Sequence, residues 1–528
     1  FDLTGKMENK YNVLSIFLFM WIIQVFQATA SKPCVPRNYG KGSYVCVCNS
    51  TYCDTVEPNI KVQKGSYSIY VSSKAGDRFK RNSNTFKSSL NSSDDVVFTV
   101  FKNHTFQRIL GFGGAFTDAA GINIASLSAD TQTNLLKSYY SPEGIEYSLG
   151  RVPMASCDFS TRPYSYDDSP GDFDLKNFSL AMEDLKYKIP FIQKAMAMSR
   201  RNIPIFGSPW SAPAWMKTNQ NMTGKGTLIG SPGGKYYKTW ANYFIKFMAA
   251  YESHNISMWG LTAQNEPTDG NIDRFSFQAM GWSAESQRDF IASDLGPALA
   301  NSKYNDVKLM IMDDQRLLLP RWAEIILQFP EAAKYVSGVG VHWYTDFIVP
   351  IIGVDKTHES FPDKFILSTE ACEGSLPFES RSPQLGSWDR GESYAHSIIE
   401  DLNHWIVGWT DWNIALDLQG GPNWVKNFVD SPIIVNAAKD EFYKQPMYYV
   451  LGHFSKFLPN GSKRIAVKGN KSTKLETVGF MLADSSIVMV VSNREDDAIG
   501  YHIYDPTIGY INLVAEPHSI QTIIWWSS

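Results

Sequence analysis

The chain has 528 residues, of which 44% are hydrophobic, 14% aromatic and 19% charged, and its formal net charge is −4. A chain of this length exceeds what one small core organises, so we expect a globular protein with more than one domain. The slight acidity, without a run of Lys or Arg, argues against nucleic acid as a partner.

The first 30 residues have the pattern of a secretory signal peptide. Two lysines precede the apolar stretch 13–26, and the small residues Ala28-Thr29-Ala30 end the segment, so cleavage is expected after Ala30. The apolar stretch is short for a membrane span, which disfavours a signal anchor. Met7 is interpreted as the start, with residues 1–6 extraneous. No later apolar run is long enough to span a bilayer, so the mature protein is expected to be soluble.

Four of the six cysteines lie close together near the start of the mature chain. In a secreted protein this clustering favours two disulfides over a zinc site. Cys48 and Cys53 enclose a tight turn, which leaves Cys34–Cys46 as the second pair. The other two follow predicted barrel strands and are interpreted as buried free thiols: Cys157 and Cys372.

Eight Asn-x-Ser/Thr sequons in a chain with a signal peptide predict a glycosylated, lumenal or secreted protein. The candidate acceptors are Asn49, Asn91, Asn103, Asn177, Asn221, Asn255, Asn460 and Asn470.

Between residues 106 and 445, apolar strands alternate with amphipathic helical segments. The predicted strands are 109–115, 147–153, 203–208, 258–263, 307–312, 336–342, 365–369 and 406–410. Eight such repeats predict a (β/α)8 barrel rather than an open doubly wound sheet. No dinucleotide-binding glycine pattern follows the first strand, and we expect neither a cofactor nor a metal.

The two flanks of this region differ from it in pattern. Residues 31–105, which include the cysteine cluster, and residues 446–528 carry short alternating stretches separated by Gly, Asn, Asp and Lys. Neither end alone supplies enough strands to cover a core. We therefore expect both chain ends to meet in one accessory antiparallel β-sandwich.

Two of the predicted barrel strands are followed by a glutamate. Glu266 follows the fourth strand and Glu370 the seventh, which places both on the carboxyl-terminal face where barrel enzymes build their sites. Two carboxyl groups so placed indicate glycoside hydrolysis. The alternative of a carrier that kept the barrel and lost turnover is disfavoured because both glutamates are present.

Long segments around these positions carry a family resemblance. They include Gly-Phe-Gly-Gly-Ala-Phe-Thr-Asp at 111–118, Arg-Val-Pro-Met-Ala-Ser-Cys-Asp-Phe-Ser at 151–160, Ser-Pro-Trp at 208–210, Val-His-Trp-Tyr at 341–344, Gly-Trp-Thr-Asp-Trp-Asn at 408–413 and Gly-Gly-Pro-Asn-Trp at 420–424. Over essentially the whole mature sequence the chain resembles the glucosylceramide-cleaving members of glycoside hydrolase family 30. The resemblance implies a retaining β-glucosidase with Glu266 as acid/base and Glu370 as nucleophile. Another family 30 activity, such as a β-glucanase or β-xylosidase, is the alternative.

These roles set electrostatic expectations. Glu370 must be ionised, and Arg151 at the end of the second strand is the candidate cation that lowers its pKa, with a purely structural ion pair as the alternative. Tyr344 and His342 are candidate hydrogen-bond donors to this nucleophile. Glu266 must begin protonated, so we expect its pKa to be raised by a partly apolar site and by the charge of Glu370.

Other strand ends supply candidates for glucose recognition. Asn265 is expected to reach the sugar 2-hydroxyl, or else to be a turn residue. Asp118 is expected to accept from the 4- and 6-hydroxyls, or else to cap the following helix. Trp210 and Trp412 are expected to wall the sugar ring, or else to belong to the core, and Asn427 is expected to add a hydrogen bond.

A lipid substrate would require peripheral contact with a membrane. Exposed apolar side chains around Phe347 and Ile348, or Trp388, are the candidates for this contact. The resemblance further implies a saposin-type activator protein and delivery to the lysosome lumen, with secretion as the alternative. We expect a monomer or a weak homo-oligomer.

Overall fold

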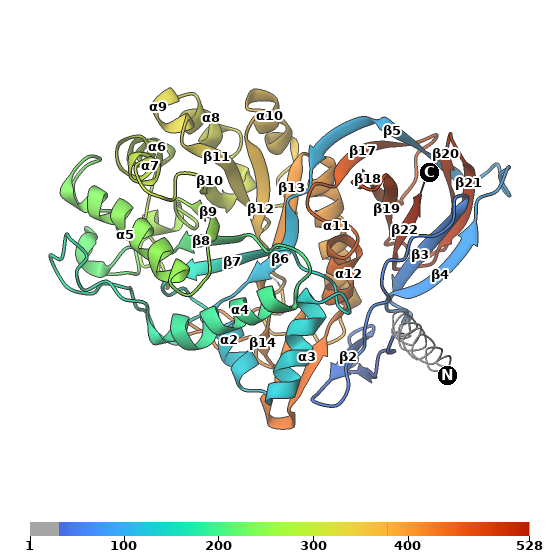
Figure 1. The fold of residues 1–528 in the computed structure, drawn as a ribbon, viewed down its shortest axis with the longest axis horizontal. Helices are drawn as coiled ribbons and strands as arrows, with labels where there is room; N and C mark the ends of the chain where they lie inside the picture. The colour runs from blue at the N-terminus through green and yellow to red at the C-terminus, as the bar shows by residue number, and fades with distance from the viewer. Residues whose placement is uncertain (1–30, 377–378, 527–528) are drawn as a thin grey trace, which may run out of the picture.

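The computed structural model describes residues 31–376 and 379–526, so the predicted signal peptide lies outside the described residues. Three sheets organise the described chain: a closed barrel, a nine-stranded sheet and a five-stranded sheet. Figure 1 shows the barrel on the left and the nine-stranded sheet on the right, with two helices, α11 (Trp388–Asn403) and α12 (Pro446–Ser455), between them.

Among the described residues, eight parallel strands form the barrel, which closes where the last strand pairs with the first. The strands are β6 (Gly111–Ala115), β7 (Leu149–Met154), β8 (Ile205–Pro209), β9 (Met258–Thr262), β10 (Lys308–Gln315), β11 (Val336–His342), β12 (Phe365–Glu370) and β13 (Ile406–Asn413). The predicted (β/α)8 barrel is therefore confirmed.

Helices cover the outside of the barrel. Besides α11 they are α2 (Asp118–Ala125), α3 (Ala129–Tyr140), α4 (Ile189–Met198), α5 (Lys235–Glu252), α6 (Ala284–Phe290), α7 (Gly296–Ala300), α8 (Arg321–Leu327), α9 (Pro330–Ala333) and α10 (Ile352–Ser360). Inside the barrel, large apolar side chains from five different strands pack together and fill it. The polar residues at the strands' carboxyl ends are therefore left to form the site.

The nine-stranded sheet combines both ends of the chain, as predicted. Its strands, in spatial order, are β21 (Gly509–Ala515), β20 (Ile499–Asp505), β5 (Val96–Arg108), β17 (Lys463–Gly469), β18 (Glu476–Met481), β19 (Ser486–Asn493), β22 (Ser519–Trp526), β3 (Ser66–Ser73) and β4 (Lys80–Thr85). All neighbours are antiparallel except β20 and β5. An apolar core of its own lies against the sheet.

The five-stranded sheet was not predicted. It joins β1 (Pro36–Asn38) and β2 (Tyr44–Cys48) from the cysteine-rich segment to three strands that follow the barrel: β14 (Leu416–Asp417), β15 (Ile433–Asn436) and β16 (Glu441–Lys444). The structure contains the disulfides Cys34–Cys46 and Cys48–Cys53. The two remaining cysteines are buried and free. The cysteine-rich segment is thus tied to the end of the barrel region.

Helix α12 holds the barrel and the nine-stranded sheet together. All ten of its residues are buried, and it contacts both β6 of the barrel and β22 of the sheet. Its His453 contacts Thr522 Oγ1 at 2.8 Å and Ser72 Oγ at 2.9 Å, which are residues from the two ends of the chain. Because burial lowers the pKa of His453 to about 3, this ring is neutral and has a structural role.

Of the eight candidate glycosylation sites, Asn49 is partly buried and the other seven are exposed. Within the part of the chain that the structure describes, no helix is both long and apolar enough to span a bilayer.

Candidate active site

The structure brings the two predicted glutamates together at the carboxyl-terminal end of the barrel. Glu370 is the last residue of β12, and Glu266 lies in the loop after β9. One oxygen of each carboxyl and one ring nitrogen of His342 all lie within 4.8 Å of one another. Retaining glycosidases hold their carboxyl groups about 5–5.5 Å apart and inverting ones about 6.5–9.5 Å apart. This separation therefore fits retention.

The backbone holds Glu266 in place from both neighbouring strands. The N–H of Asn265 donates to Pro209 O at the end of β8 (2.9 Å), and the N–H of Glu266 donates to Asp313 O in β10 (2.8 Å). Glu266 has a φ of 40°, in the left-handed region that side chains other than glycine rarely adopt. A strained conformation that neighbouring strands enforce is typical of functional residues.

Arg151 is the central cation of the site. Its guanidinium is fully buried and donates to Glu370 Oε2, to Asn265 Oδ1 at 2.7 Å and to Asp313 Oδ2 at 2.9 Å. Its Nε donates to Ser208 Oγ at 3.1 Å. The structure thus places Arg151 against the candidate nucleophile, and it makes Asp313 a second anionic partner of the same cation.

Glu370 is 5% exposed and has a second donor besides Arg151. The hydroxyl of Tyr344 donates to Glu370 Oε1 at 2.8 Å, as predicted from the sequence. Burial raises the pKa of Glu370, although the positive charges of His342 and Arg151 oppose this rise. Both carboxylate oxygens therefore have partners that fix the orientation of the side chain.

His342 contacts other partners than the predicted one. Its Nδ1 lies 3.1 Å from Glu266 Oε1, and its Nε2 lies 2.9 Å from Asp313 Oδ1. Burial lowers the pKa of His342, but the charge of Glu370 and the two hydrogen bonds raise it well above its ordinary value. The ring is thus an imidazolium that donates to two carboxylates. His342 thus donates to Glu266 and Asp313 and not to Glu370, which corrects the prediction, while its charge still favours ionised Glu370.

The environment of Glu266 also differs from the expectation. Burial raises its pKa, but the hydrogen bond from His342 and the charge of that ring lower it overall. Gln315 Nε2, at the end of β10, donates to the same Oε1 at 3.0 Å. Glu266 is thus stabilised as a carboxylate in the free protein. The sequence argument missed this because it considered Glu370 as the neighbour and not His342.

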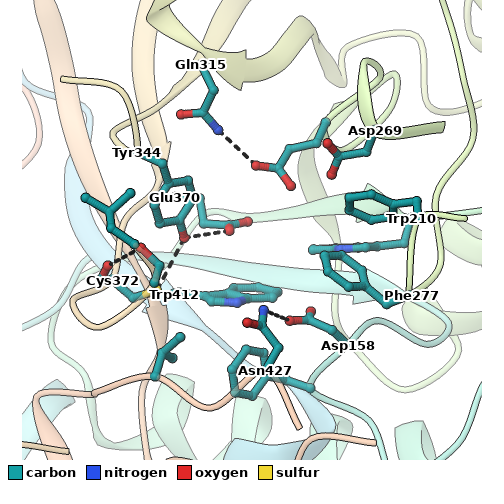
Figure 2. A pocket seen from close by; sticks show the side chains of 16 residues that line it. Asp158, Trp210, Asp269, Phe277, Gln315, Tyr344, Glu370, Cys372, Trp412 and Asn427 are labelled. Atoms are coloured by element: carbon teal, nitrogen blue, oxygen red, sulfur yellow. Dashed lines mark hydrogen bonds between the residues drawn. The ribbon is translucent and has the colours of Figure 1, made fainter. Parts of the chain in front are cut away.

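A cavity of about 260 Å³ lies over the two glutamates (Figure 2). Trp210 and Trp412 line it with stacked rings, whose centroids are 5.2 Å apart. Asn427 lines it too, and its Nδ2 donates to Asp158 Oδ2 at 3.2 Å. These three predicted residues therefore meet at one cavity with the glutamate pair.

Asp118 and Asn265 do not line this cavity. Asp118 is 1% exposed and forms an ion pair with Lys188 at 3.1 Å, while Tyr164 donates to it. The side chain that caps α2 is that of Thr117, so Asp118 fills neither predicted role. Asn265 Oδ1 accepts a hydrogen bond from Arg151, which fixes the orientation of the amide and leaves its NH2 group to donate to a sugar.

Sequence reasoning missed several polar residues of the cavity: Asp158, Asp269 and Gln315. Asp158 lies within the matched segment 151–160, and burial followed by the charge of Glu370 raises its pKa to about 7. Asp269 lies three residues after Glu266. Gln315 ends the fifth strand, for which no site residue was predicted.

Within the described residues, two groups of side chains have metal-ligand spacing. The first is Cys48, Cys53 and Asp54, but its two cysteines form a disulfide and offer no thiolate. The second is Glu266, His342 and Glu370, whose atoms are already engaged by one another, by Arg151 and by Asp313. Neither set is suited to bind a cation.

Comparisons with known proteins agree with this geometry. Residues 109–458 match the glycosyl hydrolase family 30 TIM-barrel domain, and residues 461–523 match the glycosyl hydrolase family 30 β-sandwich domain. The chain is 50% identical to lysosomal acid glucosylceramidase of Mus musculus, over 97% of this chain and 99% of the relative. It is 46% identical to putative glucosylceramidase 4 of Caenorhabditis elegans, with 97% and 99% covered. The crystal structure of SrfJ from Salmonella typhimurium superposes with a TM-score of 0.80 at 29% identity, covering 87% of this chain and 99% of that one.

Proposed function

This chain belongs to glycoside hydrolase family 30, and from that premise we propose that it hydrolyses the β-glucosidic bond of glucosylceramide to glucose and ceramide, with retention at the anomeric carbon. The observation that supports the reaction type is the placement of the Glu266 and Glu370 carboxyl oxygens within 4.8 Å of one another over the cavity. The choice of substrate rests on the 50% identity to the Mus musculus glucosylceramidase.

Glu370 is the nucleophile in this proposal. Arg151 and Tyr344 each hold one of its oxygens, so the carboxylate is oriented before the substrate arrives. It attacks the anomeric carbon and forms a glycosyl ester while the bond to the leaving oxygen breaks. Water then attacks the same carbon and releases Glu370.

Glu266 is the acid/base. It gives a proton to the ceramide oxygen as that oxygen leaves, and it later takes a proton from the attacking water. Trp210 and Trp412 offer aromatic faces beside the reacting carbon, where the apolar face of a sugar ring packs. Asn427 and Asp158 supply the polar contacts on the opposite side of the cavity from Gln315 (Figure 2).

We place the enzyme in the lysosome lumen, peripherally attached to the membrane that holds its substrate and assisted by a saposin-type activator. Support for membrane contact comes from Phe347 and Ile348, which are 57% and 68% exposed in the loop after β11. Trp388 is 1% exposed and packs in the core, so it is excluded from this surface.

Product analysis tests the proposal. Hydrolysis of glucosylceramide should exceed that of β-1,6-glucan and β-xylosides, and the first glucose released should be the β-anomer by proton NMR. Initial release of the α-anomer, or a preference for a xyloside or a glucan, would refute the assignment.

A further inference from the structure

A third carboxyl lies beside the acid/base in the active-site cavity. Asp269 begins the short 3-10 helix η3 (Asp269–Asn271) after β9, and its N–H donates to Glu266 O at 3.0 Å. This turn directs the Asp269 side chain into the cavity that Glu266 and Glu370 also line (Figure 2). Asp269 is therefore part of the same cavity and not of a surface loop.

Asp269 and Glu266 line the same cavity from a single turn of the chain, and their carboxyl groups lie close enough to interact directly. Two ionised carboxylates at such close range repel each other, and one proton retained by the pair removes this repulsion. The pair thus resembles the proton-sharing dyads that like charges form when they are held together away from water.

The surrounding groups decide which of the two residues carries the proton. Glu266 accepts hydrogen bonds at Oε1 from both His342 and Gln315, which favours its ionised form. Asp314, on β10, is the remaining acid that faces Asp269. It accepts from the N–H and hydroxyl of Thr268 and from the N–H of Gln315. Among the described residues the Asp269 carboxyl accepts no such hydrogen bond, so the proton belongs there.

The titration of Asp269 agrees with this placement. Burial, then the charge of Glu266 and the hydrogen bond to it, and then the charge of Asp314 raise the pKa of Asp269 to about 10, although the His342 charge opposes them. At neutral or acidic pH, Asp269 is therefore a neutral acid that donates to the Glu266 carboxylate.

We propose that Asp269 stores the proton that Glu266 delivers to the leaving oxygen, so that the acid/base of this enzyme is a carboxyl pair. This inference rests on the proposed function. It resolves a conflict within the site, since Glu266 must donate a proton although its contacts with His342 and Gln315 hold it as a carboxylate. Asp269 acts through Glu266 and is a positioning residue for the proton.

The proton balance is complete for both steps. In the first step the proton passes from Asp269 to Glu266 and from Glu266 to the leaving oxygen, while the bond from that oxygen to the anomeric carbon breaks and the ester to Glu370 forms. The pair then carries two negative charges and esterified Glu370 carries none, so the total charge is unchanged. In the second step water attacks the anomeric carbon, its proton returns to the pair, and Glu370 leaves as a carboxylate.

The test is the pH dependence of kcat/KM for Asp269→Asn. The asparagine cannot supply a proton, and its NH2 group stabilises ionised Glu266, so the limb that falls at high pH should move down by about one pH unit or more. At the high end of the wild-type profile, hydrolysis of an alkyl β-glucoside should fall about tenfold or more, while 2,4-dinitrophenyl β-glucoside, which needs no proton, is spared. Asp269→Glu, which keeps a carboxyl, should restore part of the profile.

The matched control is Asp273→Asn, four residues later in the same loop, where an exposed carboxyl pairs weakly with Lys225 at 3.5 Å. Its profile should superimpose on that of the wild type. Labelling of Glu370 by 2,4-dinitrophenyl 2-deoxy-2-fluoro-β-glucoside, together with Tm, identifies folded protein. An unshifted profile for folded Asp269→Asn, or equal losses on both substrates, overturns the inference. Wild-type enzyme without activity on any β-glucoside overturns the proposed function and this inference with it.

Discussion

The Glu370 side and the Glu266 side of the active site differ in whether the groups around the glutamate have a fixed charge or titrate. On the Glu370 side, Arg151 within β7 and Tyr344 just beyond β11 each hold one carboxylate oxygen, and Arg151 supplies a positive charge that does not titrate. On the Glu266 side, carboxyl groups gather around a titratable imidazolium in loops at the cavity rim. The difference matches the chemistry, because a nucleophile must keep one charge state whereas an acid/base must change its own twice per turnover.

Replacement of Glu370 tests the nucleophile half and should give the largest effect. Glu370→Gln keeps the shape but cannot form the ester, so kcat should fall about 10⁴-fold or more for every leaving group. Glu373→Gln is the control, since burial raises the pKa of that nearby carboxyl to about 8 and the amide mimics its neutral form. Near-normal turnover by folded Glu370→Gln, measured with both alkyl and dinitrophenyl glucosides, would contradict the assignment.

Replacement of Glu266 should slow substrates to different extents, according to how much their leaving group needs a proton. Glu266→Gln removes proton donation but leaves Glu370 and its donors in place. The first step should slow about 10²–10⁴-fold for alkyl β-glucosides and hardly at all for dinitrophenyl β-glucoside. Steady-state rates with both substrates measure this ratio. Equal losses would mean that Glu266 only shapes the cavity.

Arg151, on the Glu370 side of the site, should also contribute to the stability of the fold. Arg151→Gln would leave Glu370 and Asp313 buried without the guanidinium that they share, and breaking a buried pair typically costs about 3–5 kcal/mol. Denaturant unfolding should therefore show a clearly lower midpoint. Arg162→Gln breaks a bidentate pair with Glu183 in which the arginine is 54% exposed, and it should cost at most about 1 kcal/mol. Similar losses of unfolding free energy in the two variants would show that burial of Arg151 does not determine its contribution to stability.

The same contrast explains what the sequence could predict. Strand ends follow from apolar periodicity, so the barrel and the strand-end positions of the glutamate pair were predicted, whereas the two tryptophans at the cavity were expected from the family resemblance. The directions of polar side chains depend on partners that are distant in the chain. Asp118 turns to Lys188, which lies beyond the second barrel strand, and His342 turns to Glu266, 76 residues earlier. The pairing of β2 with β16, nearly 400 residues later, likewise has no local signal.

Replacement of Tyr344 should give the smallest effect of these variants, and it tests the Glu370 side of the site alone. Its hydroxyl donates to Glu370 Oε1, and a hydrogen bond to a carboxylate favours the ionised form. Tyr344→Phe removes this donor while Arg151 keeps the other oxygen, so the pKa of Glu370 should rise. Because Glu370 must be ionised to attack, the limb of kcat/KM that falls at low pH should move to higher pH, while the limb at high pH, which belongs to the Glu266 half, stays in place. One lost hydrogen bond to a charged group is worth about 1.5–3 kcal/mol. On the low-pH limb, kcat/KM should therefore fall by at most roughly 10- to 150-fold. If both limbs moved together, the two halves would titrate as one unit and the contrast between them would not hold.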